Sequence, residues 1–209
     1  MKPRFDLSLY LVTDPGLTAS RDLPELVRAA VRGGVSLVQL RDKTSPDDVF
    51  AEQARALIAV LRPLGVPLIV NDRVEVARWI GADGVHVGQD DADPRQVRER
   101  MGPDAIVGLS AGTPEEFAAA PLDVVDYLGV GPVFATATKP DHDPPLGVAG
   151  LAALARIAPL PTVAIGGIGA SNAAAVRATG VNGIAVVSAI CAAADPEAAA
   201  RWLAGRAPR

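Results

Sequence analysis

Hydroxyl and ammonium groups stand close together in one segment of the sequence. Thr136, Thr138 and Lys139 follow an apolar run at residues 127–130, and a proline-rich stretch comes next. Proline suits neither a helix interior nor the middle of a sheet, so we expect a long irregular loop here. Such a loop on a compact chain is usually functional or disordered, and hydroxyls beside an ammonium suit a phosphate or diphosphate. An ordinary surface loop is the alternative.

Cationic side chains follow a second apolar run. The segment Gln39-Leu40-Arg41-Asp42-Lys43 ends that run. Because side chains alternate along a strand, Gln39, Arg41 and Lys43 are expected on one side. Two cations and an amide at a strand end could bind a diphosphate, although a solvated rim is the alternative reading.

Carboxylates follow the next two apolar runs. Asn71-Asp72 comes after one run, and Gln89-Asp90-Asp91 comes after the other. Neighbouring parallel strands lie about 4.8 Å apart, so carboxylates at their matching ends can approach one cation. Mg²⁺ prefers one or two carboxylates together with water and phosphate oxygens. The alternative is that these aspartates serve a helix cap and a turn.

Further polar groups end the later runs. Ser110 could donate its hydroxyl, or could be a surface residue before a turn. The turns at Gly166-Gly167 and at Val187-Ser188 could offer backbone N–H groups to a phosphate, and Ser171 is expected to cap the helix after the first of them.

The two histidines predict no nucleophilic triad. His86 lies inside an apolar run, which favours a hydrogen-bonded core histidine over a catalytic base, and His142 lies in the proline-rich loop. We therefore expect two anionic subsites without a nucleophilic side chain. One combines Arg41, Lys43, Lys139 and a metal. The other combines the loop that carries Thr136 and Thr138 with the turns at Gly166-Gly167 and Val187-Ser188. The reaction would then proceed by departure of diphosphate and capture of the resulting cation by a second substrate.

Composition narrows the class of protein. The chain has 209 residues, 49% of them hydrophobic, and a net charge of −4, which argues against general electrostatic binding of nucleic acid. A single cysteine, Cys191, excludes an intramolecular disulfide and a cysteine-clustered zinc site. With no long apolar stretch, a cytoplasmic protein is expected, with no membrane partner; a homo-oligomer is left open.

Alternation of short apolar runs and amphipathic segments predicts the elements that hold these groups. The expected strands are residues 9–13, 37–41, 68–71, 84–87, 105–109, 127–130, 162–165 and 183–187. Helix starts are marked by Ser45-Pro46, Asp93-Pro94, Thr113-Pro114 and Asp195-Pro196. Repeated strand–helix units imply parallel pairing, so we expect an α/β fold, a single (β/α)8 TIM barrel spanning residues 1–209 as one domain. An open doubly wound sheet is the alternative, but no G-x-G-x-x-G follows the first strand.

Nearly the whole chain resembles the thiamine-phosphate synthase (thiamine-phosphate pyrophosphorylase) family. The matching segments are LYLVTD (9–14), VQLRDK (38–43), VND (70–72), GADGVHVGQDD (81–91), VGLS (107–110), GVGPVFATATK (129–139), AIGGI (164–168) and VVSAI (186–190). The resemblance implies a Mg²⁺-dependent transferase of thiamine biosynthesis. Its substrates would be 4-amino-5-hydroxymethyl-2-methylpyrimidine diphosphate and 4-methyl-5-(2-phosphoethyl)thiazole or its carboxylated form, and its products thiamine phosphate and diphosphate.

The resemblance also implies residue roles. The pyrimidine diphosphate would be bound by Gln39, Leu40, Arg41, Asp42, Lys43, Asn71, Ser110 and Lys139, of which Arg41, Lys43, Ser110 and Lys139 would be catalytic. Asp72 and Asp91 would hold Mg²⁺. The thiazole phosphate would be bound by Thr136, Ala137, Thr138, Gly167, Val187 and Ser188. The implied mechanism is dissociative, which agrees with the missing nucleophile.

One departure from the family pattern leaves two alternatives to weigh. The family often reads S-x-H-T after the fifth strand, whereas this chain has Ser110-Ala111-Gly112-Thr113. A thiazole tautomerase on the same scaffold is the nearest alternative, but the missing histidine and the full set of charged residues argue against it. A non-catalytic barrel that binds phosphorylated ligands is the other.

Overall fold

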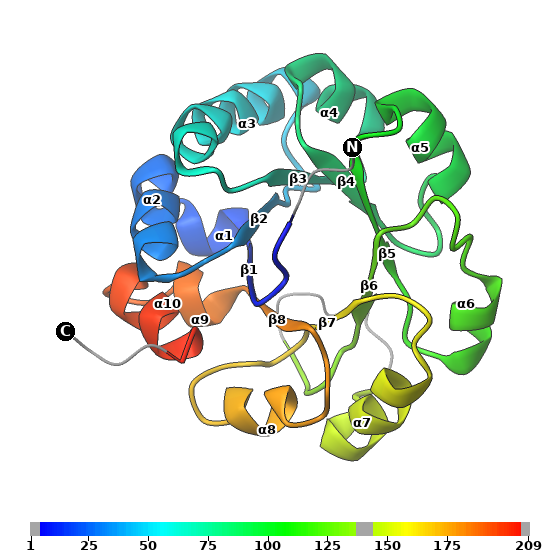
Figure 1. Ribbon diagram of the computed structural model, residues 1–209. Helices are drawn as coiled ribbons and strands as arrows, with labels where there is room; N and C mark the ends of the chain where they lie inside the picture. Colours follow the sequence, from blue (N-terminus) through cyan, green and yellow to red (C-terminus); the bar gives the residue numbers. More distant parts are fainter. Residues whose placement is uncertain (1–4, 137–143, 206–209) are drawn as a thin grey trace.

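The strands of the protein close into a barrel. The computed structural model describes residues 5–136 and 144–205. Its parallel strands lie in the order β1-β2-β3-β4-β5-β6-β7-β8, and β8 pairs with β1 through the register Leu9↔Ile184. Figure 1 shows the strands as an inner ring and the helices as an outer ring. The expected (β/α)8 barrel is confirmed, and the open doubly wound sheet is wrong.

The strand boundaries agree with the prediction to within one residue. The strands are β1 Leu9–Val12, β2 Leu37–Leu40, β3 Leu68–Asn71, β4 Gly84–Val87, β5 Ile106–Ser110, β6 Tyr127–Val130, β7 Thr162–Ala164 and β8 Gly183–Val186. Most of their residues are buried, as expected for parallel strands covered on both faces.

Helices connect the strands and form the outer ring. They are α1 Pro15–Thr18, α2 Leu23–Gly33, α3 Asp47–Leu61 followed by the 3₁₀ turn η1 Arg62–Leu64, α4 Val74–Ile80, α5 Pro94–Met101, α6 Pro114–Ala119, α7 Gly147–Ile157, α8 Ala173–Arg177, α9 Ser188–Cys191 and α10 Pro196–Leu203. None of the helices in residues 5–136 and 144–205 is long and apolar enough to cross a membrane.

Three of the four predicted helix caps are confirmed. The side chains of Asp93, Thr113 and Asp195 each accept a hydrogen bond from an amide of the first turn. The prediction for Ser45 is wrong, because helix α3 begins without a side-chain cap. The Ser45 hydroxyl instead donates to Asp42 Oδ2 at 2.5 Å, so it stabilises the loop that precedes the helix.

Buried side chains form two layers. Inside the barrel lies a cluster that includes Tyr10, Leu37, Ile69, Ile106 and Tyr127. A larger cluster fills the space between the strands and the helices. Both tyrosines are almost fully buried, so each hydroxyl needs a partner inside the barrel.

The segment before β1 covers the N-terminal end of the barrel. Phe5 and Leu7 pack against the interior cluster, and Phe5 lies 5.9 Å from the Tyr127 ring centroid to centroid. A Cβ on Gly183, the first residue of β8, would lie 1.7 Å from the Leu7 carbonyl oxygen. The C-terminal ends of the strands therefore form the mouth at which ligands can enter.

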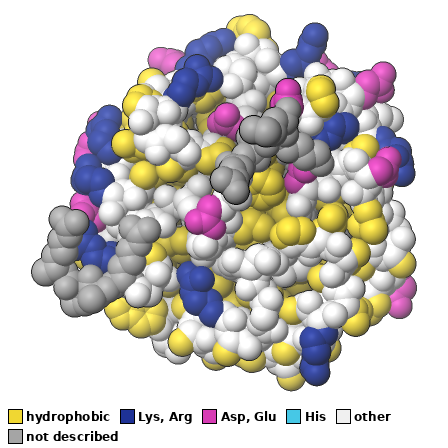
Figure 2. All heavy atoms as spheres, viewed as in Figure 1, with side chains coloured by type: hydrophobic (Ala, Val, Ile, Leu, Met, Phe, Trp, Pro, Cys, Tyr) yellow, Lys and Arg dark blue, Asp and Glu magenta, His cyan; other side chains and the backbone are white. Residues whose placement is uncertain are grey.

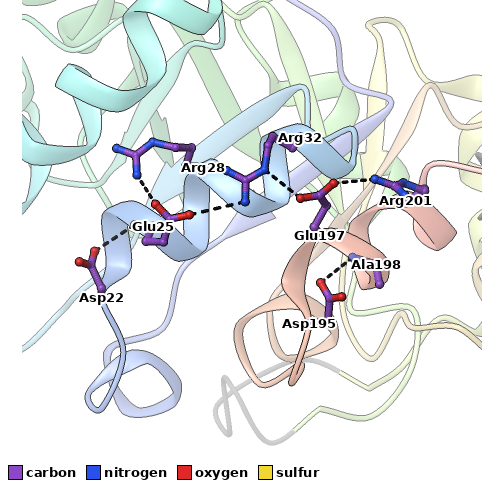
Figure 3. A network of polar contacts seen from close by, with 8 residues as sticks. All are labelled: Asp22, Glu25, Arg28, Arg32, Asp195, Glu197, Ala198 and Arg201. Carbon is purple, nitrogen blue, oxygen red and sulfur yellow. Dashed lines mark hydrogen bonds and ion pairs between the residues drawn. The ribbon is translucent and has the colours of Figure 1, made fainter. Parts of the chain in front are cut away.

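The first and last large helices close the outer ring. Arg32 of α2 donates to Glu197 of α10 at 2.8 Å, and Arg201 donates to the same carboxylate at 2.6 Å (Figure 3). Arg32 also lies 3.5 Å from Glu25 within α2. The backbones approach closely beneath these ion pairs, since a Cβ on Gly33 would lie 2.4 Å from the Glu197 carbonyl oxygen.

Surface charge is mixed in sign. On the face seen in Figure 1, both basic and acidic side chains are spread around the rim, with hydrophobic side chains between them (Figure 2). Together with the net charge of −4, this face offers no extended basic surface for a nucleic acid backbone.

Candidate active site

Several of the predicted site residues within the described chain lie at the mouth of the barrel. Asn71 ends β3, Ser110 ends β5, and Val187 and Ser188 directly follow β8. All four are at least partly exposed. Ala137, Thr138 and Lys139 lie outside the described residues, so their roles stay predictions.

Asp72 and Asp91 meet at the mouth. They follow β3 and β4, and their carboxyl groups lie close enough for each to shift the pKa of the other. Burial and the neighbouring Asp91 raise the pKa of Asp72. Burial also acts to raise the pKa of Asp91, but Asp72, the Gly88 amide and Lys43 outweigh it and lower that pKa. The opposite shifts show that the two carboxyl groups interact with each other and with Lys43 at the mouth.

The surroundings of this pair suit a hard cation. Lys43 Nζ lies 3.1 Å from Asp72 Oδ2, and the Gly88 amide donates to Asp91 Oδ2 at 2.7 Å. No group of three or more histidine, cysteine, aspartate or glutamate side chains gathers as a possible metal site in the described chain. Two neighbouring carboxylates fit Mg²⁺, which takes its remaining ligands from water and phosphate.

The backbone of Asp72 is held in an unusual conformation. Its φ is +60°, the only positive φ of a non-glycine residue in the described chain. The Asp72 amide donates to the His86 carbonyl at 3.0 Å, and the Val74 amide donates to the Asp72 carbonyl at 2.9 Å. These bonds on both sides of the residue offset the cost of the left-handed region and aim the carboxylate at Asp91.

The Asp42 side chain does not point to the mouth. It is 4% exposed, and its carboxylate accepts hydrogen bonds from the amides and hydroxyls of Thr44 and Ser45. Burial by itself raises the pKa of Asp42, but these four donors outweigh it and lower the pKa to about 2. Arg73 holds the same loop by donating to the carbonyls of Asp42 and Ser45 at 2.8 and 2.7 Å. Asp42 therefore shapes the loop that carries Lys43.

The other residues of this segment divide between the two faces of β2. Leu40 is 1% exposed and belongs to the outer core, so only its backbone can face a substrate. Arg41 is partly exposed and lines a cleft of about 360 Å³ beside α1 and α3. Its amide donates to Thr13 Oγ1 at 3.0 Å, and its guanidinium forms no ion pair with another described residue.

Hydrogen bonds cross the barrel from Gln39 on β2 to Ser110 on β5. Gln39 Nε2 lies 2.8 Å from Tyr10 Oη, which lies 2.9 Å from Tyr127 Oη. His86 Nδ1 lies 3.0 Å from Tyr127 Oη, and His86 Nε2 lies 2.9 Å from Ser110 Oγ. The prediction of a hydrogen-bonded core histidine is confirmed. Burial lowers the pKa of His86 to about 4, with Asp91 acting in the opposite direction, and raises the pKa of both tyrosines.

Sequence reasoning missed Tyr10 and Tyr127. The available signal was a tyrosine within each of two apolar strands, since a buried phenol hydroxyl needs a partner. Which partner it finds depends on the pairing of strands across the barrel. Of the chain's two histidines, only His86 lies among the described residues.

A second polar region lies below the loops after β7 and β8. Gly167, Gly169, Ser171 and Ser188 line a cleft of about 500 Å³ that extends to Trp202 of α10. The loop after β6 reaches the same place, because the Phe134 amide donates to the Gly166 carbonyl at 3.0 Å. Thr136, two residues further on, is partly exposed. The structure thus brings the described end of the loop after β6 close to the turn after β7, whose cleft also includes Ser188.

The helix after β7 is not capped as predicted. Asn172, not Ser171, precedes α8, and the Ser171 side chain is exposed. Asn172 accepts from the Gly169 amide at 2.9 Å and donates to the Gly167 carbonyl at 2.9 Å. The asparagine therefore shapes the glycine turn itself, which leaves Ser171 on the wall of the cleft.

Gly112 occupies the position at which the family that this chain resembles often has a histidine. Its amide donates to Glu116 Oε2 at 2.5 Å, and the Glu116 amide donates to Thr113 Oγ1 at 3.2 Å. This reciprocal arrangement is close to a capping box, but the glutamate reaches one residue further back, to Gly112 in place of Thr113. The loop is therefore ordered without a side chain at position 112.

Comparison with known proteins identifies relatives of high similarity. The family model described as thiamine monophosphate synthase matches residues 9–190. The thiamine-phosphate synthase of Solidesulfovibrio magneticus is 60% identical over 203 residues, covering 97% of this chain and 96% of the relative. That of Azorhizobium caulinodans is 58% identical over 199 residues, covering 95% and 94%.

Solved structures agree with this assignment. Thiamine phosphate pyrophosphorylase from Pyrococcus furiosus superposes with a TM-score of 0.84 at 37% identity, covering 94% of this chain and 93% of the other. A 3-hexulose-6-phosphate synthase, with a TM-score of 0.66 at 20% identity, shares the fold alone. A family model that spans most of the chain, relatives at 58–60% identity and the carboxylate pair at the barrel mouth lead to one conclusion: the chain belongs to the thiamine monophosphate synthase family.

Proposed function

We propose that this transferase of thiamine biosynthesis joins 4-amino-5-hydroxymethyl-2-methylpyrimidine diphosphate to 4-methyl-5-(2-phosphoethyl)thiazole, or to its carboxylated form. The products are thiamine phosphate and diphosphate, together with carbon dioxide when the carboxylated thiazole is the substrate. The observation that carries this proposal is the pair Asp72 and Asp91, which lies beside Lys43 at the mouth of the barrel, with Lys43 Nζ 3.1 Å from Asp72 Oδ2. Such a pair suits a leaving diphosphate held by a cation and an ammonium.

The diphosphate subsite consists of groups from β2, β3, β4 and β5. Lys43 binds phosphate oxygens next to the carboxylate pair, and Arg41 supplies a second cation. Ser110 and Asn71 contribute from the ends of β5 and β3. Mg²⁺ on Asp72 and Asp91 would neutralise the charge that develops on the leaving diphosphate.

The protein's own groups then need to stabilise a cation and exclude water. Within residues 5–136 and 144–205, no cysteine or serine stands next to a base in the manner of an activated nucleophile at this mouth: His86 touches Ser110 but has a pKa near 4 and a tyrosine on its other nitrogen. This supports a dissociative reaction, in which the C–O bond to diphosphate breaks before the thiazole nitrogen forms the new C–N bond.

The thiazole phosphate occupies the second subsite in this proposal. The cleft of about 500 Å³ offers the Gly167 turn and the start of α9 at Ser188, both at the mouth. The loop carrying Thr136 borders the same turn. Lys139, Thr138 and Ala137 complete the two subsites as predicted from the sequence.

A cytoplasmic location is part of the same proposal. The single cysteine, Cys191, is buried and free, which suits a reducing compartment. The partners in this proposal are the two phosphorylated substrates.

Diphosphate release from the purified protein tests the proposal. We expect release only when both substrates and Mg²⁺ are present. Release with the pyrimidine diphosphate alone would make the protein a hydrolase. Conversion of a thiazole carboxylate tautomer without release would make it an isomerase, and binding of either substrate without turnover would make it a sensor.

Neighbouring aspartates provide a matched test of the metal site. Asp72→Asn and Asp91→Asn are expected to raise the Mg²⁺ concentration required for half-maximal rate by about tenfold or more, since each removes one of two charged ligands. Asp90→Asn is the control, because Asp90 is exposed and forms no hydrogen bond or ion pair with another described residue. Equal Mg²⁺ titrations for all three variants would refute the assignment.

A further inference from the structure

The hydrogen bonds that cross the barrel run through five strands. Gln39 lies on β2, Tyr10 on β1, Tyr127 on β6, His86 on β4 and Ser110 on β5. We call these five residues the cross-barrel chain. Each of its four bonds is between 2.8 and 3.0 Å long, so every member is within hydrogen-bonding distance of the next.

Glycines on the neighbouring strands make room for this chain. A Cβ on Gly108 would lie 2.3 Å from Tyr127 Cζ and 2.4 Å from His86 Nδ1. A Cβ on Gly129 would lie 3.0 Å from His86 Cε1. Only glycine fits at position 108, so the backbone of β5 is matched to the bond between His86 and Tyr127.

The number of protons on each group determines which member of the cross-barrel chain donates to the next. The Gln39 amide nitrogen can only donate, so Tyr10 accepts from it and must donate its single hydroxyl proton to Tyr127. Tyr127 must then donate to His86 Nδ1, which has to be unprotonated. The proton of the neutral imidazole is therefore on Nε2 and is donated to Ser110 Oγ.

The hydrogen bond between His86 and Ser110 determines whether Ser110 presents a donor or an acceptor to a ligand. Its oxygen already accepts from His86, and its own proton has no acceptor among the described side chains, so the partly exposed hydroxyl can donate this proton to a ligand at the mouth. If the Gln39 amide were turned by 180°, every link would reverse. Ser110 would then donate to His86 and present only lone pairs to the mouth, which would repel a phosphate.

We propose that Tyr10, Tyr127 and His86 are positioning residues that act through the cross-barrel chain to fix Ser110 as a hydrogen-bond donor toward the substrate diphosphate. The inference rests on the proposed function for the identity of that ligand. The direction of the chain is a property of the protein alone, and it can be measured without substrate.

The tautomer of His86 is the direct test. The chain contains two histidines, so a His142→Gln background leaves His86 as the only imidazole for ¹⁵N NMR. We expect a single neutral tautomer at pH 7, with the proton on Nε2 and none on Nδ1. A proton on Nδ1, or an exchanging mixture, would overturn the proposal, whatever the protein's activity.

Removal of the Tyr127 hydroxyl tests which group sets the tautomer of His86. Tyr127→Phe leaves His86 Nδ1 without its donor, so we expect both tautomers to be populated. Phe5→Leu is the matched control, because Phe5 packs on the Tyr127 ring but takes no part in the chain, and it should keep the Nε2–H form. Retention of the single tautomer in Tyr127→Phe would show that another group sets it.

A double-mutant cycle tests whether the effect passes through Ser110. Tyr127→Phe and Ser110→Ala should each lower kcat/KM for the pyrimidine diphosphate by about tenfold to a hundredfold, the range for a hydrogen bond to a charged group. In the Ser110→Ala background, Tyr127→Phe should cost no more than about threefold. Losses that multiply in full would mean that the tyrosine acts independently of Ser110. A wild-type protein without diphosphate release would contradict the proposed function but leave the tautomer result standing.

Discussion

Replacement of Asp42 by asparagine should destabilise the protein in a way that depends on pH. The carboxylate is 4% exposed and accepts four hydrogen bonds from Thr44 and Ser45, two of them from backbone amides. Asparagine at this position keeps one acceptor oxygen and places an NH₂ group where the Ser45 hydroxyl now donates. The substitution therefore removes both the charge and part of the hydrogen bonding.

The magnitude follows from the pKa of the group. The pKa of Asp42 falls from 3.8 to about 2 on folding, because donors from Ser45 and Thr44 outweigh the effect of burial. A depression of about 2 pKa units corresponds to roughly 2.5 kcal/mol of stability. Because the folded pKa is depressed, this stability is present above the unfolded pKa near 4 and is lost as the pH falls from about 4 to about 2.

Urea unfolding followed by circular dichroism at several pH values measures this effect. We expect Asp42→Asn to lower the free energy of unfolding by about 2 kcal/mol at pH 7, with the difference from the unmodified protein shrinking below pH 4. Asp48→Asn is the control in the same segment, because Asp48 is exposed, and it should cost less than about 1 kcal/mol. A difference that stays constant between pH 7 and pH 2.5 would refute the reasoning.

Three further substitutions test other parts of the structure. Gly33→Ala should lower the free energy of unfolding by about 1–3 kcal/mol, because its Cβ would lie 2.4 Å from the Glu197 carbonyl; an unchanged urea midpoint would contradict this close approach. Arg98→Met should cost about 3–5 kcal/mol by leaving the buried Asp126 carboxylate without its cation, and Arg98→Met with Asp126→Asn should recover part of the loss in the same assay. Lys43→Met should raise KM for the pyrimidine diphosphate about tenfold or more in steady-state kinetics, and a change confined to the thiazole phosphate would contradict its assignment.

The sequence was sufficient to predict the barrel and the place of the carboxylates. Both follow from rules that depend on neighbouring positions: apolar runs bounded by glycine and capping residues predict strands and helices, and adjacent parallel strands bring their ends together. Asp72 and Asp91 meet for that reason, since β3 and β4 pair with Asn71 opposite His86.

Two features of the site depend on contacts that such rules do not reach. Whether Asp42 faces a substrate or its own loop depends on whether a ligand or the nearby donors of the loop bind its carboxylate more strongly. The Ser45 hydroxyl is one of these loop donors, although it was expected to cap helix α3. The cross-barrel chain depends on the distance between β1 and β6 across the interior, which no local pattern encodes.

The contact between α2 and α10, which closes the outer ring of helices, has a consequence for the synthesis of the protein. The ion pair between Arg32 and Glu197 spans 165 positions, and β1 and β8 also pair only across nearly the whole chain. A ribosome adding about 5–20 residues per second would expose the open edges of β1 and of the newest strand for many seconds. Until β8 emerges, β1 lacks its second neighbour and the nascent sheet keeps two unpaired edges. We therefore expect the need for chaperones to end once β8 and α10 have both been released.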